Sequence, residues 1–103
     1  MDIALYPGSF DPITYGHLNI IERALGVFEK LTVLVAVNPQ KNPLFTTEEC
    51  VAMVEEAARE WPQVQVDHHE GLLVDYARNH DIHIAVRGLR AVTDFENEFA
   101  MAL

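Results

Sequence analysis

The fold is decided by residues 7–17, which read Pro7-Gly8-Ser9-Phe10-Asp11-Pro12-Ile13-Thr14-Tyr15-Gly16-His17. The apolar residues 3–6 before this stretch predict a short buried strand, and apolar side chains from Leu18 to Phe28 recur at helical spacing after it. A strand that leads into a helix through such a loop directs free backbone N–H groups and the positive end of the helix dipole to one point. That point suits an anion, most often a phosphate.

Three residues of this loop carry the expected chemistry. Gly8 and Gly16 permit a positive φ and let a ligand approach the backbone closely. His17, in the first turn of the helix, can donate a hydrogen bond to a phosphoryl oxygen. The same residues are equally compatible with an ordinary strand-to-helix turn that carries a surface histidine.

Length and composition bound the class of protein. The chain has 103 residues, half of them apolar, which predicts one globular domain over residues 1–103. Its formal net charge of −9 argues against a nucleic-acid-binding surface, because such a surface needs a positive potential. The single cysteine, Cys50, is typical of a reducing compartment. We find neither a signal peptide nor an apolar run near the ~20 residues that span a bilayer, so we expect a cytoplasmic protein without a membrane partner.

The remaining chain alternates between strand and helix patterns. The expected strands are 3–6, 31–37, 64–66 and 82–86, and the expected helices are 17–29, 46–60, 72–78 and 93–103. Capping-box pairs, Thr46 with Glu49 and Thr93 with Glu96, mark two of the helix starts. The order predicts an open parallel α/β sheet of the dinucleotide-binding, Rossmann-like type, with the strand at 64–66 nearer its edge.

Three of the seven Lys and Arg residues, Lys41, Arg87 and Arg90, follow the ends of predicted strands. Ligands of open α/β sheets bind at these carboxyl ends, and paired guanidinium groups hold phosphates well. The alternatives are a solvated Lys41 and an ion-pair cluster between the arginines and the carboxylates of residues 94–98. The clustering of cations in an acidic chain favours a polyanion site. His68 and His69 predict no metal site, because neighbouring residues of an extended segment point apart and zinc-ligand spacing is lacking.

Two motifs resemble a known family. Thr14-Tyr15-Gly16-His17 matches the nucleotidyltransferase superfamily pattern of His or Thr, any residue, Gly and His. The longer string YPGSFDPITYGH, residues 6–17, resembles bacterial phosphopantetheine adenylyltransferases, and RGLRAVTDFE, residues 87–96, resembles their second motif. The resemblance implies a Rossmann-like nucleotidyltransferase fold with the first strand central, and transfer of AMP from ATP to 4′-phosphopantetheine with Mg²⁺. Dephospho-coenzyme A and coenzyme A are further implied ligands, and a hexamer is the implied assembly.

The resemblance also implies residue roles. His17 would stabilise the α-phosphoryl group in the transition state, and Ser9 would touch both substrates. The implied ATP contacts are Ser9, Phe10, His17, Gly88, Leu89, Arg90 and Glu98. The implied 4′-phosphopantetheine contacts are Ser9, Lys41, Leu73 and Arg87.

The family pattern continues beyond Leu103 with further strand and helix, including a Ser-rich segment that grips the ATP phosphates. We therefore expect a fold that is incomplete at its C-terminal end and an impaired ATP site. Two alternative functions stay open: a superfamily transferase acting on nicotinate mononucleotide or a cytidylyl substrate, and a non-catalytic binding module. The intact second motif argues against the first alternative.

Overall fold

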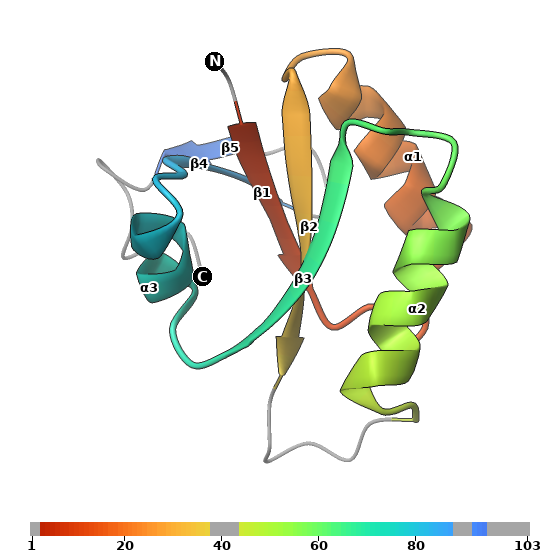
Figure 1. Cartoon of the computed structure of the whole chain (residues 1–103). Helices are drawn as coiled ribbons and strands as arrows, with labels where there is room; N and C mark the ends of the chain where they lie inside the picture. Colours follow the sequence, from red (N-terminus) through yellow and green to blue (C-terminus); the bar gives the residue numbers. More distant parts are fainter. Residues whose placement is uncertain (1–2, 38–43, 88–91, 95–103) are drawn as a thin grey trace.

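The computed structural model describes residues 3–37, 44–87 and, for the backbone, 92–94 (Figure 1). In chain order the elements are β1 (Ile3–Gly8), α1 (Tyr15–Leu25), β2 (Lys30–Val37), α2 (Thr47–Ala57), β3 (Val64–Glu70), α3 (Leu73–Asn79), β4 (Ile84–Val86) and β5 (Val92–Asp94). The alternating pattern predicted the type and order of the first seven. No helix within the described ranges has the length and apolar character needed to cross a membrane.

The sheet has the strand order β3-β2-β1-β4-β5, with β1 to β4 parallel to one another. β1 is central, as the family resemblance implied, and β3 lies at the edge, as its sequence pattern predicted. In register, Leu5 of β1 faces Thr32 of β2 on one side and Ala85 of β4 on the other. This arrangement brings the carboxyl ends of β1, β2 and β4 to one edge of the sheet.

The prediction of a helix beginning at Thr93 is wrong for the residues that the structure describes. Val92–Asp94 form β5, which pairs antiparallel with β4 through Val86 and Val92, Ala85 and Thr93, and Ile84 and Asp94. The local Thr93–Glu96 capping signal is overridden because the β4 edge offers backbone hydrogen bonds to a segment that starts with β-branched residues. The sheet is therefore mixed at this edge. Residues 95–103 of the predicted helix lie outside the described ranges.

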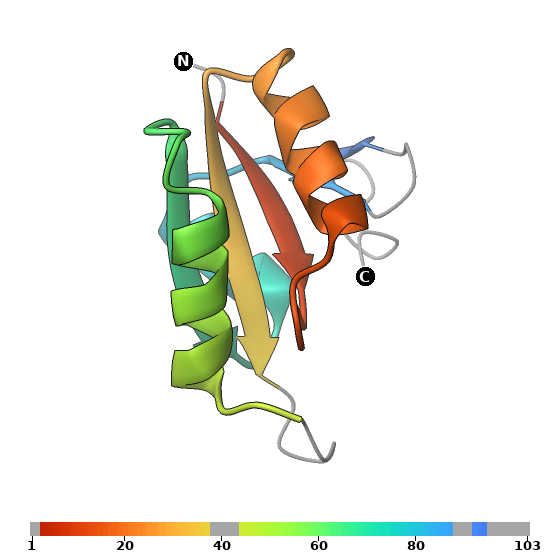
Figure 2. The same cartoon turned by 90° about the vertical axis from the view of Figure 1, so that its right-hand side faces the viewer.

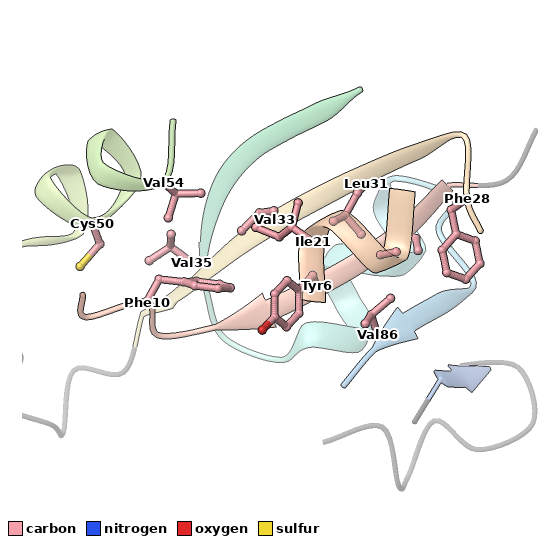
Figure 3. Close-up of a cluster of buried hydrophobic side chains, with 12 residues drawn as sticks. Tyr6, Phe10, Ile21, Phe28, Leu31, Val33, Val35, Cys50, Val54 and Val86 are labelled. Atoms are coloured by element: carbon pink, nitrogen blue, oxygen red, sulfur yellow. The ribbon is translucent and has the colours of Figure 1, made fainter. Parts of the chain in front are cut away.

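Two helices cover one face of the sheet and α3 covers the other (Figures 1 and 2). The larger core cluster lies under α1 and α2, where Leu31, Val33 and Val35 of β2 meet both helices. Figure 3 shows these side chains in a row that runs from Cys50 and Phe10 at one end to Phe28 at the other. The smaller cluster lies under α3 and includes Leu34. β2 is therefore buried on both faces, as its nearly unbroken apolar run predicted.

Most corrections to the predicted elements concern their ends. α1 stops at Leu25 because Gly26 caps it, four residues before the predicted end. α2 ends at Ala57, and its predicted Thr46–Glu49 capping box is present, with hydrogen bonds of 2.8 and 3.1 Å. β3 continues to Glu70, because its ladder with β2 runs through to the pair of Val37 and Glu70.

Candidate functional site

A pocket of about 330 Å³ opens at the carboxyl end of β1, where the chain turns into α1. Its lining comes from the end of β1, the connecting loop and the first turns of α1. The lining residues are Tyr6, Pro7, Gly8, Phe10, Thr14, Gly16, His17 and Ile20. The sequence stretch that resembles the nucleotidyltransferase motif thus forms one concave surface at the edge where ligands of parallel sheets bind.

Phe10 forms the floor of this pocket. Its ring is 1% exposed and makes edge contacts with Tyr6, at 5.3 Å between ring centroids, and with His17, at 4.9 Å. Its backbone has a φ of +47°, so the left-handed turn of the loop occurs at Phe10. Neither Gly8 nor Gly16 adopts the positive φ that glycine permits. Gly8 has another role, because a Cβ there would lie 3.1 Å from the Phe10 ring.

Thr14 and His17 hold each other at the start of α1. The Thr14 N–H donates to Nδ1 of His17 at 2.9 Å, and the His17 N–H donates to the Thr14 hydroxyl oxygen at 3.4 Å. This is a capping box in which histidine takes the place usually held by Glu or Gln. Because Nδ1 accepts a hydrogen bond, the neutral ring carries its proton on Nε2. The sequence interpretation recognised Thr14 and His17 as parts of a motif but did not predict that they cap the helix.

The electrostatic setting of His17 suits an anion. Burial lowers the pKa of His17, so the neutral imidazole with its Nε2–H donor is favoured at neutral pH. The first turn of α1 contains no acidic residue, so no side-chain carboxylate there neutralises the positive end of the helix dipole. The arrangement can therefore donate an imidazole N–H and helix-terminal backbone N–H groups to the same phosphoryl group.

Asp11 links this loop to the segment that begins α2. Its two carboxylate oxygens accept hydrogen bonds from the backbone N–H groups of Leu44, at 2.7 Å, and Phe45, at 2.9 Å. The Cys50 thiol lies 3.8 Å from the same carboxylate. Burial and the neighbouring Asp11 carboxylate raise the pKa of Cys50, which keeps the thiol protonated as a donor. The sequence interpretation assigned no role to Asp11, and its partners are too distant in the chain for a local motif to reveal.

The other predicted site residues fall into two groups. Ser9 is exposed in the pocket loop, and Arg87 is exposed directly after β4, the strand that pairs with β1. Leu73 begins α3 and packs, half-buried, against the smaller core cluster on the opposite face of the sheet, whereas its neighbour Leu72 is 58% exposed. The remaining predicted site residues lie outside the described ranges; they are Lys41, Gly88, Leu89, Arg90 and Glu98.

Comparison with known proteins supplies the family. A family model described as cytidylyltransferase-like matches residues 5–103. The chain belongs to this cytidylyltransferase-like family. It is 54% identical over 103 residues to phosphopantetheine adenylyltransferase of Carboxydothermus hydrogenoformans, an alignment that covers all of this chain and 64% of the relative. The chain thus spans somewhat less than two thirds of the length of this relative.

Solved structures share the fold of this family. A bifunctional NMN adenylyltransferase/ADP ribose pyrophosphatase from Francisella tularensis, complexed with AMP and a manganese ion, matches with a TM-score of 0.60 and 22% identity. That match covers 78% of this chain and 26% of the neighbour. A lipopolysaccharide core biosynthesis protein from Thermoplasma volcanium matches with a TM-score of 0.67 and 22% identity, over 84% of this chain and 73% of the neighbour. At this identity the likeness concerns the Rossmann-like fold alone.

The described part of this cytidylyltransferase-like chain holds no group of three or more His, Cys, Asp or Glu side chains arranged for a metal ion. Asp11 is the carboxylate nearest in sequence to the pocket-lining residues, and both of its oxygens already accept backbone hydrogen bonds. These residues do not fit a resident metal, so we assign none of them as a metal ligand.

A second polar cluster fixes α3, the helix that starts at Leu73, to the edge strand β3. Tyr76 is 5% exposed, and its hydroxyl donates a hydrogen bond of 2.8 Å to the Asp67 carboxylate. The His80 ring stacks on the Tyr76 ring with 4.0 Å between the ring centroids. Burial alone would raise the pKa of Asp67. The net shift of this pKa is nevertheless downward, because the carboxylate accepts hydrogen bonds from the Tyr76 hydroxyl and the His68 N–H and lies near the charges of His68 and His80. Burial and Asp67 raise the pKa of Tyr76.

Replacing Tyr76 by Phe should lower the free energy of unfolding by about 2 kcal/mol at pH 7, the usual contribution of a hydrogen bond to a charged group. The pKa of the Asp67 carboxyl is lower in the folded state than its ordinary value of 3.8. Its contribution to stability is therefore fully present at a pH above 3.8 and is lost as the pH falls through the folded-state pKa. Urea unfolding from pH 7 to pH 3 should therefore show the Tyr76→Phe difference shrinking below the ordinary value. The control is Tyr15→Phe, at a residue 89% exposed, which should change little. A difference independent of pH would contradict the assigned Asp67 interaction.

Proposed function

We propose that the chain catalyses adenylyl transfer from ATP to 4′-phosphopantetheine, giving dephospho-coenzyme A and pyrophosphate. The observation that carries this proposal is the His17 imidazole, which lines the pocket of the Thr14–His17 motif with Nδ1 occupied and Nε2 left as a donor. The 54% identity to a phosphopantetheine adenylyltransferase supports this choice of acceptor. The activity belongs to coenzyme A biosynthesis.

The proposed reaction is an in-line displacement at the α-phosphorus of ATP. A phosphate oxygen of 4′-phosphopantetheine forms the new P–O bond, and the bond to the β-phosphate oxygen breaks to release pyrophosphate. The protein needs no nucleophilic side chain, so its contribution is positioning and electrostatic stabilisation. His17 Nε2–H donates to an α-phosphoryl oxygen, where negative charge builds in the transition state. The helix-terminal N–H groups of α1 act on the same charge.

Substrate contacts follow the family resemblance. Ser9 and Phe10 are proposed to meet the ATP phosphates through the pocket loop, and Gly88, Leu89, Arg90 and Glu98 are proposed as further ATP contacts. Lys41 and Arg87 are proposed to hold the phosphate of 4′-phosphopantetheine, and Leu73 its pantetheine arm. Arg87 has support from its position at the carboxyl end of β4, beside the strand that leads into the pocket. Mg²⁺ is proposed to enter with ATP as part of the substrate.

The proposal extends to location and assembly. A cytoplasmic location is supported by the free, buried thiol of Cys50, which is typical of a reducing compartment. The family resemblance predicts a hexamer, which sedimentation equilibrium of the purified chain would test. Coenzyme A is proposed as a further ligand of the 4′-phosphopantetheine site.

Calorimetry and a pyrophosphate-release assay test the function. We expect the chain to bind 4′-phosphopantetheine, to bind ATP–Mg²⁺ more weakly because the ATP site is expected to be impaired, and to release pyrophosphate only when 4′-phosphopantetheine is the acceptor. Nicotinate mononucleotide, and a cytidylyl donor with its acceptor, serve as comparison substrates. If pyrophosphate is released faster with either of them than with 4′-phosphopantetheine, the proposed function is wrong and the chain is another transferase of the superfamily. Binding without any pyrophosphate release would instead indicate a non-catalytic binding module.

A further inference from the structure

Asp11 connects the pocket loop after β1 to the segment before α2 through side-chain hydrogen bonds outside the sheet. The pocket loop follows β1, whereas Leu44 and Phe45 precede α2 and lie more than 30 residues later in sequence. Two short hydrogen bonds, 2.7 and 2.9 Å long, run from these two backbone N–H groups to the two oxygens of one carboxylate. Charge-assisted bonds of this kind hold geometry more firmly than neutral ones.

The position of Asp11 makes this link relevant to the pocket. Asp11 directly follows Phe10, the residue that carries the left-handed turn and supports the His17 ring. A positive φ at a bulky residue persists only where the surroundings hold it. Two sets of contacts hold the backbone of Phe10 here: its own ring packs against Tyr6 and His17, and the carboxylate of the next residue, Asp11, is hydrogen-bonded to the segment before α2. The Cys50 thiol of α2 adds a third contact to that carboxylate.

We propose that Asp11 is a positioning residue, which holds the start of α2 against the pocket loop and thereby keeps Phe10 and His17 in place for the nucleotide. This inference rests on the proposed function for the identity of the ligand. Asp11 itself does not line the pocket, and its oxygens are already engaged, so its effect on the ligand is exerted through the loop.

The test is the variant Asp11→Asn. The Asn side chain has one acceptor oxygen, so it can accept from only one of the Leu44 and Phe45 N–H groups, and its NH₂ group faces the other, where two donors would meet. We expect hydrogen exchange at the Leu44 and Phe45 amides to accelerate by about tenfold or more. The affinity for ATP–Mg²⁺ should fall on the order of tenfold, since small displacements at a site have effects of that size or larger. The matched control is Thr46→Ala, which removes the α2 cap but leaves the Asp11 bonds in place.

Thr46→Ala should lower the stability of α2 and change the ATP–Mg²⁺ affinity by less than about twofold. Unchanged affinity in Asp11→Asn, or equal losses in both variants, would overturn the positioning role. If the unaltered chain does not bind ATP–Mg²⁺, the proposed function fails and the effect on binding fails with it. The exchange rates at Leu44 and Phe45 would still decide by themselves whether Asp11 holds the two segments together.

Discussion

Replacing His17 by Ala should slow pyrophosphate release roughly hundredfold, an increase of about 3 kcal/mol in the activation barrier, as for the loss of one oxyanion donor. In the proposed mechanism, the Nε2–H of His17 stabilises negative charge that builds at the α-phosphoryl group only in the transition state. The ground-state affinity for ATP–Mg²⁺ should therefore change only modestly. Steady-state pyrophosphate release and calorimetry on the same preparations separate the two effects. A fall of less than tenfold would contradict the assignment.

His17 also accepts the Thr14 N–H, so alanine removes a helix cap together with the proposed donor. The His17→Gln variant separates these roles, because Gln at the same position is a usual partner in a capping box. We expect His17→Gln to unfold at nearly the same urea concentration as the unaltered chain and yet to lose most of the rate. Asn19→Ala, at an exposed residue of the same helix, should change neither property. Full activity in His17→Gln would show that only the cap matters.

The sequence predicted those features that depend on local patterns. β2 was recognisable because an almost continuous apolar run suits a strand buried on both faces, and α2 because Thr46 and Glu49 stand three residues apart. The location of the pocket followed from a Gly- and Pro-containing loop between an apolar strand and an amphipathic helix. In each case the physical cause lies within a few residues of the signal.

The features that sequence reasoning missed depend on distant partners. Asp11 is paired with Leu44 and Phe45 across the fold, and Tyr76 reaches back to Asp67 on a different element. The strand at Val92–Asp94 forms because β4 offers an unpaired edge, although Thr93 is also the first residue of the predicted capping pair with Glu96. Tertiary hydrogen bonding decided each of these, and no local propensity could anticipate it.

Replacing Phe10 by Ala should lower the free energy of unfolding by about 3–5 kcal/mol, the usual cost of removing a buried aromatic ring. The ring is 1% exposed and stands at the end of the larger core cluster next to the pocket (Figure 3). Its loss leaves a cavity beside Tyr6 and removes the support of the His17 ring. Urea unfolding measures the stability, and calorimetry with ATP–Mg²⁺ measures the pocket.

Phe28 provides the matched control, because it belongs to the same core cluster and is 9% exposed, yet lies at the opposite end of the row in Figure 3. Phe28→Ala should cost a similar free energy of unfolding but leave the ATP–Mg²⁺ affinity within about twofold, since Phe28 is not among the residues that line the pocket. Phe10→Leu, expected to cost on the order of 1 kcal/mol, keeps the fold for the binding comparison if the alanine variant unfolds. If Phe10→Leu and Phe28→Ala bind ATP–Mg²⁺ equally well, the Phe10 ring is a core residue only, and the pocket geometry must be maintained by the Thr14–His17 cap and Asp11.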